Sequence, residues 1–241
     1  TDTDQEEVAQ LIQRYDFLAV PVVDTEQRLV GIVTVDDVLD ILEEEATEDI
    51  YALGGVQSGG DNYFQTNLLT VARKRVVWLS VLLLTNTVTT WVIRSQEAVL
   101  EQVVVLAAFI PLLIGTGGNV GAQSSTVVIR GINTQEVDNK SALTVIRREA
   151  IAGAFLGIML GIVVTGWAFL LQGSLPVSII VGISLVAIAI LASTAGAALP
   201  FLFNAIGFAP ALMSAPFITT VVDVLGVLIY LNLARYILKL G

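Results

Sequence analysis

The sequence contains no cysteine and no histidine among its 241 residues. Without cysteine it can form neither disulfides nor thiolate metal sites, and without histidine it lacks the commonest ligand for transition metals. Catalytic sites built on either residue are excluded, and no nucleophile-elbow motif is present, so we expect that the protein is not an enzyme. The metal ligands that remain are oxygen atoms, which suit hard cations such as Mg²⁺ and Ca²⁺.

Basic residues are scarce in the first part of the chain, and charges of either sign are scarce in the rest. Residues 1–72 hold 16 acidic residues and two basic ones, a net charge of −14, whereas residues 73–241 hold six acidic and ten basic residues, a net charge of +4. The chain is 55% hydrophobic, more than is usual for a soluble domain. This asymmetry predicts an acidic soluble head, which attracts cations and repels nucleic acid, joined to a membrane body. Because the chain begins at Thr1 without a methionine, we expect it to be part of a longer protein.

The acidic head shows the pattern helix, strand, strand, helix. An amphipathic helix is predicted over 6–15, strands over 17–24 and 28–34, and a second helix from Val35 onward. Two strands cannot form a self-sufficient core, so this unit should need a partner. The glycine-rich residues 54–62 predict a hinge in front of the membrane body.

The second helix of the head is strongly acidic. No Lys or Arg occurs from Leu29 to Ala72 to offset its charge, and like charges spaced four residues apart destabilise a helix. The run is either a solvated face or a place where divalent cations bind, and the sequence leaves both readings open. Its eight carboxylates are Asp36, Asp37, Asp40, Glu43, Glu44, Glu45, Glu48 and Asp49.

Five apolar spans follow, each long enough for the ~20 residues that cross a bilayer. We place them at about 76–93, 98–130, 150–171, 177–203 and 210–238. Basic residues are more frequent on one side, which predicts a multi-pass protein of the cell membrane with its N-terminus in the cytoplasm and its C-terminus outside. The inner flanks then hold Arg73, Lys74, Arg75, Arg130, Lys140, Arg147 and Arg148, and the outer flanks hold Arg94, Arg235 and Lys239.

Asp223 is the only Asp, Glu, Lys or Arg between Ala150 and Ala234. Inserting an aspartate at the middle of a membrane helix costs roughly 2.5–3.5 kcal/mol, so its side chain should face a partner or water. Thr219 and Thr220 lie on the same helical face, one turn before it. A buried aspartate that is bonded to another helix, or kept protonated, remains an alternative, but the cost favours a carboxylate that lines an ion path.

A glycine-rich stretch, IPLLIGTGGNVGAQSSTVVIRG at 110–131, lies inside the second apolar span. It lacks the sequence and the setting of a phosphate loop. Pro111 and the glycines are expected to break the span. Carbonyl groups freed in this way are tolerated only against protein or water, as at cation sites of transporters. Asn119 begins a polar run after them. The alternative is close packing of helices through small residues.

Three stretches carry a resemblance to a known family. They are DFLAVPVVD with RLVGIVTVDDVLDILEEEATEDIYALGGV, PLLIGTGGNVGAQSSTVVIRG, and LPFLFNAIGFAPALMSAPFITTVVDVLGVLIYLNLAR. Through them essentially the whole chain resembles the MgtE family of magnesium channels. The resemblance implies a mainly α membrane protein with five transmembrane helices per subunit, preceded by a partial α/β CBS domain and a connecting plug helix. The chain then divides into a partial second CBS domain at 1–35, the acidic plug helix and hinge at 36–72, and the pore domain at 73–241.

The resemblance also implies a homodimer in membrane lipid, with a pore along the dimer axis between the second and fifth membrane helices. Asp223 matches the pore aspartate that holds a hydrated Mg²⁺, Gly118 matches a glycine whose carbonyl frames that site, and Thr219 matches another pore-lining position. Asn119 and Ala122 belong to the same lining. Ala122 and Ala215 stand where some relatives carry asparagine, so side-chain contacts to the hydrated ion should be fewer here.

In the head, the resemblance implies regulation of Mg²⁺ uptake by intracellular Mg²⁺. The matching acidic positions are Asp4, Glu6, Asp16, Asp37, Asp40, Glu45, Glu48 and Asp49. Some relatives bind ATP at a complete CBS pair, and Phe17, Thr34 and Asp37 would fit such a site.

Two other functions stay open on the sequence. One is a proton- or sodium-coupled secondary transporter of divalent cations that uses Asp223 as its carrier group, which inverted repeats would favour; none is visible in the sequence. The other is a non-transporting membrane receptor with a nucleotide-binding head, which leaves the glycine-rich stretch unexplained.

Overall fold

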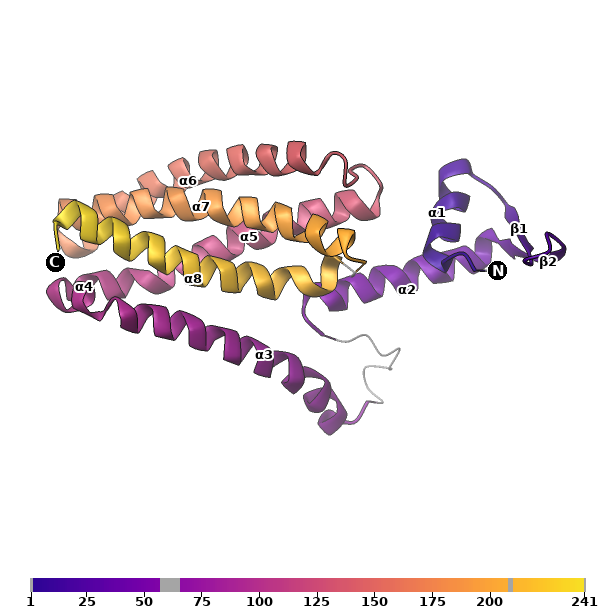
Figure 1. Ribbon diagram of the computed structural model, residues 1–241, viewed down its shortest axis with the longest axis horizontal. Coiled ribbons are helices and arrows are strands. Elements are labelled where there is room, and N and C mark those ends of the chain that lie inside the picture. The colour runs from indigo at the N-terminus through magenta and orange to yellow at the C-terminus, as the bar shows by residue number, and fades with distance from the viewer. Residues whose placement is uncertain (1, 57–65, 208–209, 241) are drawn as a thin grey trace. The chain divides into compact units, whose positions relative to one another are not determined.

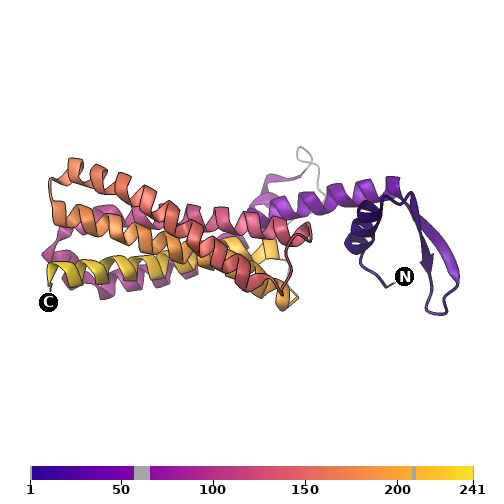
Figure 2. The same cartoon turned by 90° about the horizontal axis from the view of Figure 1, so that it is seen from above.

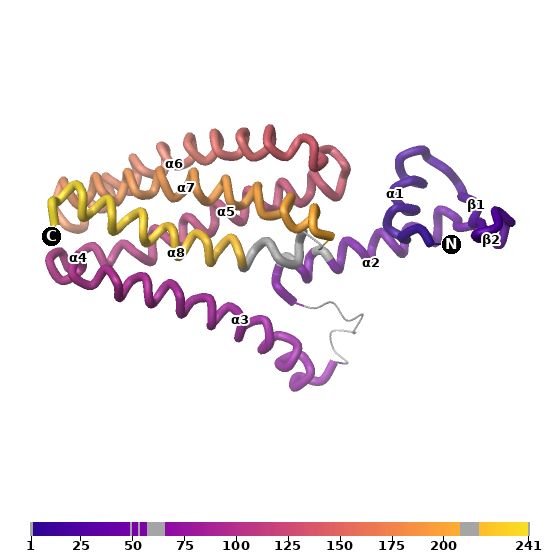
Figure 3. The backbone as a smooth tube through the Cα atoms, viewed as in Figure 1, coloured from indigo at the N-terminus to yellow at the C-terminus, as the bar shows by residue number. Residues whose placement is uncertain are grey.

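The computed structural model describes residues 2–56, 66–207 and 210–240, without the side chains of residues 49, 53 and 210–216. The chain forms two units, Thr1–Thr66 and Asn67–Gly241. Figure 1 shows the elements of both units, and each unit is described below by itself. The trace in Figure 3 follows the same path along the backbone.

The first unit consists of helix α1 (Gln5–Tyr15), strands β1 (Ala19–Val23) and β2 (Leu29–Thr34), and helix α2 (Val35–Leu53). The strands pair antiparallel. A small core joins the helices to the sheet through Ala9, Ile12, Val20 and Val38. Apolar side chains such as Leu18 and Ile32 remain 82% and 63% exposed. This exposure agrees with the expectation that the unit needs a partner.

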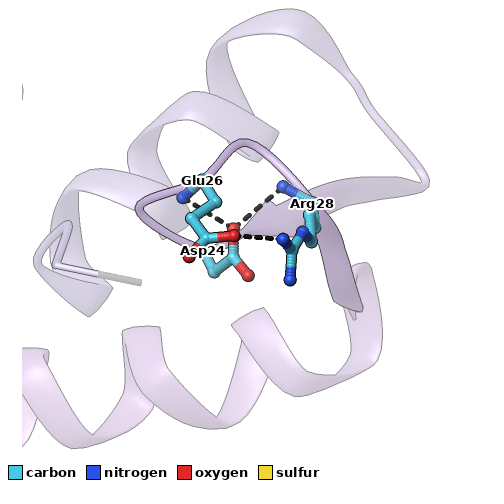
Figure 4. A network of polar contacts seen from close by, with 3 residues as sticks. All are labelled: Asp24, Glu26 and Arg28. Atoms are coloured by element: carbon cyan, nitrogen blue, oxygen red, sulfur yellow. Dashed lines mark hydrogen bonds and ion pairs between the residues drawn. The ribbon is translucent and has the colours of Figure 1, made fainter.

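The turn between the two strands is organised by one carboxylate. Asp24 Oδ1 accepts hydrogen bonds from the backbone N–H groups of Glu26 and Arg28, at 2.8 and 2.9 Å. The Arg28 guanidinium also pairs with the Glu26 carboxylate, as Figure 4 shows. Gln27 takes a positive φ of 63°, which closes the turn. One of the two basic residues of the head is therefore used within a hairpin turn.

The second unit is a bundle of long helices. It contains α3 (Leu68–Ser95), α4 (Glu97–Gln102), the 3₁₀ helix η1 (Val104–Phe109), α5 (Ile110–Asn133), α6 (Ala142–Gln172), α7 (Leu175–Ala205) and α8 (Pro210–Leu238). Within the described residues, five segments are long and apolar enough to cross a membrane: 68–95, 104–133, 142–172, 175–205 and 217–238. The mainly α-helical membrane fold predicted from the sequence is confirmed.

Helix α7 is the centre of this bundle and packs against α5, α6 and α8. Figure 2 shows α5, α6, α7 and α8 running alongside one another. Helices α6 and α7 approach closely because small residues meet there: a Cβ atom added at Gly153 would lie 2.6 Å from Ser193 Oγ, and one added at Gly157 would lie 2.8 Å from Val186 Cα. The bundle is thus held by small-residue packing of the kind common between membrane helices.

The long second span is interrupted just before Pro111, as predicted, but it is not interrupted at the glycine cluster. Helix α5 is continuous from Ile110 to Asn133 and includes the whole glycine cluster. The prediction of a helix broken at these glycines was therefore wrong. The interruption lies before them, where Val103 leaves the helical region and η1 follows. Pro111 favours an interruption at this place. Proline is accepted in the first turn of a helix, but it has no N–H that could donate to a carbonyl of the preceding turn.

Candidate functional site

The glycine cluster of α5 forms a close crossing with α8. A Cβ atom at Gly117 would lie 2.7 Å from Val222 Cγ1, and one at Gly121 would lie 2.5 Å from Ile218 Cγ2. Both distances are too short for any larger residue without movement of the neighbour. The glycines therefore serve helix packing, the alternative that the sequence left open, and they bring the backbone of α5 next to the helix that carries Asp223.

Asp223 directly follows Val222 of this crossing and is partly exposed, whereas Val222 and Val227 are buried. It makes no ion pair and no side-chain hydrogen bond with any described residue of the same chain. In the middle of an apolar span, such a group cannot face lipid without a large cost. The side of α8 that carries it therefore requires water or another protein surface.

The other residues expected at the pore lie on α5 and α8 near the same crossing. Gly118 is close to Thr219: a Cβ atom at Gly118 would lie 3.9 Å from Thr219 Cγ2. Asn119 and Ala122 are exposed on α5, and Thr219 is partly exposed on α8. The fold brings the two predicted helices together, with polar and small residues open to one side. The side chain of Ala215 falls outside the described residues.

Because α5 is regular at Gly118, that carbonyl belongs to the helical hydrogen-bond ladder and is not freed by a break. A helical carbonyl keeps a second lone pair and can still accept from a water of a hydrated ion. The described residues contain no cluster of three or more Asp, Glu, His or Cys side chains that could hold a bare metal ion.

The structure adds a polar contact that the sequence does not predict. Ser124 on α5 lies with its Oγ 2.7 Å from Glu149 Oε2 on α6 and 3.0 Å from the Ser193 carbonyl on α7. Ser124 is 5% exposed and Ser193 is 2% exposed. Glu149 directly precedes Ala150, where the stretch begins in which Asp223 is the only charged residue. Its charge is therefore visible in the sequence, but it lies just outside that stretch. Three helices meet at this contact.

In the head, several predicted regulatory carboxylates have local roles. Asp4 caps α1 and accepts the Glu6 N–H at 2.9 Å, while Asp16 ends α1 in the left-handed region with φ of 53°. Glu45 accepts from Gln5 Nε2 at 3.3 Å, and the Glu6 carboxylate accepts from Gln10 Nε2 at 3.1 Å. Asp40 and Glu48 are exposed along α2. The side chain of Asp49 falls outside the described residues.

Asp37 and Thr34 form the capping box of α2. Thr34 Oγ1 donates to Asp37 Oδ2 at 2.7 Å, and the Thr34 N–H donates to the same oxygen at 3.2 Å. These bonds, the hydroxyl first, lower the pKa of the Asp37 carboxyl. Phe17, the third residue of the expected nucleotide site, stacks on Tyr15 with ring centroids 5.5 Å apart. Thr34 and Asp37, two of the three residues expected to contact ATP, are thus hydrogen-bonded to each other.

Comparisons with known proteins agree with both units. Residues 110–233 match the family model MgtE, described as a divalent cation transporter, and residues 1–44 match the CBS domain. A curated protein of Thermus thermophilus named "Magnesium transporter MgtE" is 47% identical over 239 residues, which are 99% of this chain and 53% of the relative. Proteins of the same name from Bacillus subtilis and Enterococcus faecalis are 39% and 37% identical over 96% and 98% of this chain, and 51% of each relative. The chain thus spans about half the length of the curated relatives it matches.

Proposed function

We propose, from the premise that this chain belongs to the MgtE family of divalent cation transporters, that the protein carries Mg²⁺ across a membrane along a path lined by α5 and α8. The relatives are named as magnesium transporters, which agrees with the expectation that the chain is not an enzyme. The observation that carries the proposal is Asp223: a partly exposed carboxylate within an apolar span, without a partner in the described chain, beside a close α5–α8 crossing.

The path is completed by a second copy of the chain. The face that carries Asp223, Asn119 and Ala122 is open in one chain, and exposing it to lipid would leave a carboxylate in hydrocarbon. Pairing two copies across this face places two Asp223 carboxylates around one aqueous path. A homodimer embedded in lipid follows from this argument and from the resemblance to the family.

The arrangement suits Mg²⁺ as the transported ion because Mg²⁺ gives up its water reluctantly. Two carboxylates and the nearby carbonyl oxygens would contact the water shell and not the ion itself. Selection then depends on the size and charge of the hydrated ion. Alanine at 122 offers the water shell fewer side-chain oxygens than an asparagine at this position would. We therefore expect discrimination against Ca²⁺ to depend mostly on Asp223 and on the width of the path.

Replacement of Asp223 by alanine in the full-length protein tests this function. We expect Mg²⁺ flux into liposomes to fall at least about tenfold, which corresponds to roughly 1.4 kcal/mol, while the protein remains folded and dimeric by size exclusion. Asn232→Ala is the matched control, because Asn232 is exposed on the same helix and bonds only to the Leu228 carbonyl within it. Flux of the Asp223→Ala protein close to that of the control would refute the assignment.

The acidic head is proposed to act as the regulatory part. Its carboxylates repel one another, and Mg²⁺ bound between them at high cytosolic concentration would hold the closed state together by binding it more tightly than the open state. The N-terminus then lies in the cytoplasm and the C-terminus outside. ATP binding at a complete CBS pair stays a prediction, and the pairing of Thr34 with Asp37 gives it no support.

Coupled transport is the second candidate, because a membrane carboxylate can also carry a proton or a sodium ion. Flux measured against imposed proton and sodium gradients separates the two mechanisms. A channel responds to the Mg²⁺ gradient and the membrane potential alone, whereas a coupled transporter drives Mg²⁺ against its own gradient.

A further inference from the structure

The interruption before α5 is joined to α8 by one buried hydrogen bond. Tyr230 donates its hydroxyl to the Leu106 carbonyl in η1 at 3.0 Å, across 124 residues of sequence. Tyr230 is 1% exposed and Leu106 is 0% exposed, so no water replaces this bond in the folded protein. The carbonyl belongs to the irregular segment that precedes α5, where the ladder of the α-helix is absent.

The bond lies within a well-packed part of the bundle. Val99, Leu106, Phe109 and Leu113 belong to the same buried cluster as Tyr230. Apolar packing of this kind is favourable but non-directional. The hydrogen bond from the Tyr230 hydroxyl to one carbonyl adds a directional constraint, because such a bond weakens steeply with distance and angle. The bond therefore fixes the position of η1 along α8.

Tyr230 follows Asp223 by seven residues, which is about two helical turns, so both lie on nearly the same side of α8. The continuous segment of η1 and α5 is thus held against α8 at two levels. One is the glycine crossing at Gly117 and Gly121, and the other is the Tyr230 bond at η1. With rises of 1.5 Å per residue in an α-helix and about 2.0 Å in a 3₁₀ helix, the two levels are roughly 15–20 Å apart.

A pair of helices held at one point can still rotate and slide about it, whereas two points fix both movements. We propose that Tyr230 is a positioning residue for ion passage: its bond to Leu106 holds α5 in register with α8 and so sets the width of the path beside Asp223. This inference rests on the proposed function, because it assigns Tyr230 to the transport path that α5 and α8 line. Tyr230 itself does not contact the ion.

The test is Tyr230→Phe in the full-length protein, which removes one oxygen and keeps the ring. Permeability to Mg²⁺ relative to Ca²⁺ is measured in liposomes together with single-channel conductance. We expect the permeability ratio to shift several-fold, because the freed segment lets α5 move against α8. A purely structural defect lowers the number of active channels, but it leaves the Mg²⁺-to-Ca²⁺ permeability ratio and the conductance of each remaining channel unchanged. Tyr236→Phe is the control, since Tyr236 is on the same helix and 83% exposed.

Two further measurements keep the outcomes distinct. If Asp223→Ala abolishes flux while Tyr230→Phe keeps the wild-type ratio and conductance, the positioning role is overturned and the proposed function stands. If Asp223→Ala transports normally, the proposed function itself fails. If the Tyr230→Phe protein does not insert in the membrane, the same measurement is made with 3-fluorotyrosine at position 230. This residue keeps the ring and the hydroxyl but alters the strength of the hydrogen-bond donor. An unchanged ratio there also overturns the proposal.

Discussion

At the scale of single residues, the glycines of α5 differ sharply in what surrounds them. Gly121 has Ile218 Cγ2 at 2.5 Å from the position of an added Cβ, whereas Gly115 on the same helix has nothing within 4 Å. Sequence alone treats both as members of one cluster. Their separate roles come from the neighbour that each one meets, so the same substitution should have different effects on stability at the two positions.

We expect Gly121→Ala to lower the stability of the bundle by about 1–3 kcal/mol, the usual cost of overpacking. Gly115→Ala should be neutral or stabilising by up to about 1 kcal/mol, because alanine favours the helix more than glycine does. Thermal unfolding in detergent, followed by size exclusion, measures both. Equal melting temperatures for the two variants would contradict the close α5–α8 crossing.

A second residue-scale prediction concerns Asp138, in the segment between α5 and α6. The Ser141 N–H, followed by the Ser141 hydroxyl, lowers the pKa of the Asp138 carboxyl from its ordinary value of 3.8. A carboxyl with a lowered pKa in the folded state contributes stability above its unfolded pKa, and this contribution is lost as the pH falls through the folded value. The loss therefore begins below about pH 4.

Hydrogen exchange over residues 134–146 measures this effect. Protection should be constant from pH 7 to about pH 4.5 and should decrease at lower pH. In Asp138→Asn the side chain can still accept from the Ser141 N–H but does not titrate, so its protection should not change over the same range. The same acid-induced loss in both proteins would show that another group is responsible.

At the scale of elements, the ends of helices differ most from the expectation. The third apolar span was placed at 150–171, but α6 begins at Ala142 and includes Arg147, Arg148 and Glu149. Hydropathy detects the part of a helix that lies in lipid, whereas the hydrogen-bond ladder continues into the polar region. These residues, about two helical turns, carry Glu149 to Ser124 and so join α6 to α5.

Ser124→Ala removes that link. We expect it to lower stability by about 1–2 kcal/mol, because a hydrogen bond to a carboxylate is lost and Glu149 remains without this donor. Thr126→Ala is the matched control on the same helix, since the Thr126 hydroxyl is exposed and bonds only to the Ala122 carbonyl of α5. Unfolding of both variants in the same detergent measures the difference. If Ser124→Ala lowers stability no more than Thr126→Ala does, the Ser124–Glu149 contact does not stabilise the bundle.

At the scale of the whole molecule, charge separates the acidic head from the membrane body. In the full-length protein, neutralising Asp37, Asp40, Glu45, Glu48 and Asp49 together should leave Mg²⁺ flux high when Mg²⁺ on the cytoplasmic side is raised, because fewer ions bind the closed state. The wild-type flux should fall under the same conditions. Glu26→Gln, in the β1–β2 turn, is the control and should behave as the wild type. If cytoplasmic Mg²⁺ still fully inhibits flux through the five-residue variant, these carboxylates of α2 do not regulate transport.

The sequence by itself determined the class of the protein and its five membrane helices, and it singled out Asp223 as the candidate pore residue. It could do so because hydropathy and the cost of a carboxylate in lipid depend on residue type and local order alone. Only the tertiary structure decided that the glycines pack α5 against α8 without breaking it, that Glu149 reaches Ser124, and that Tyr230 holds η1. Those features depend on which side chains meet across helices far apart in the sequence, and no local pattern contains that information.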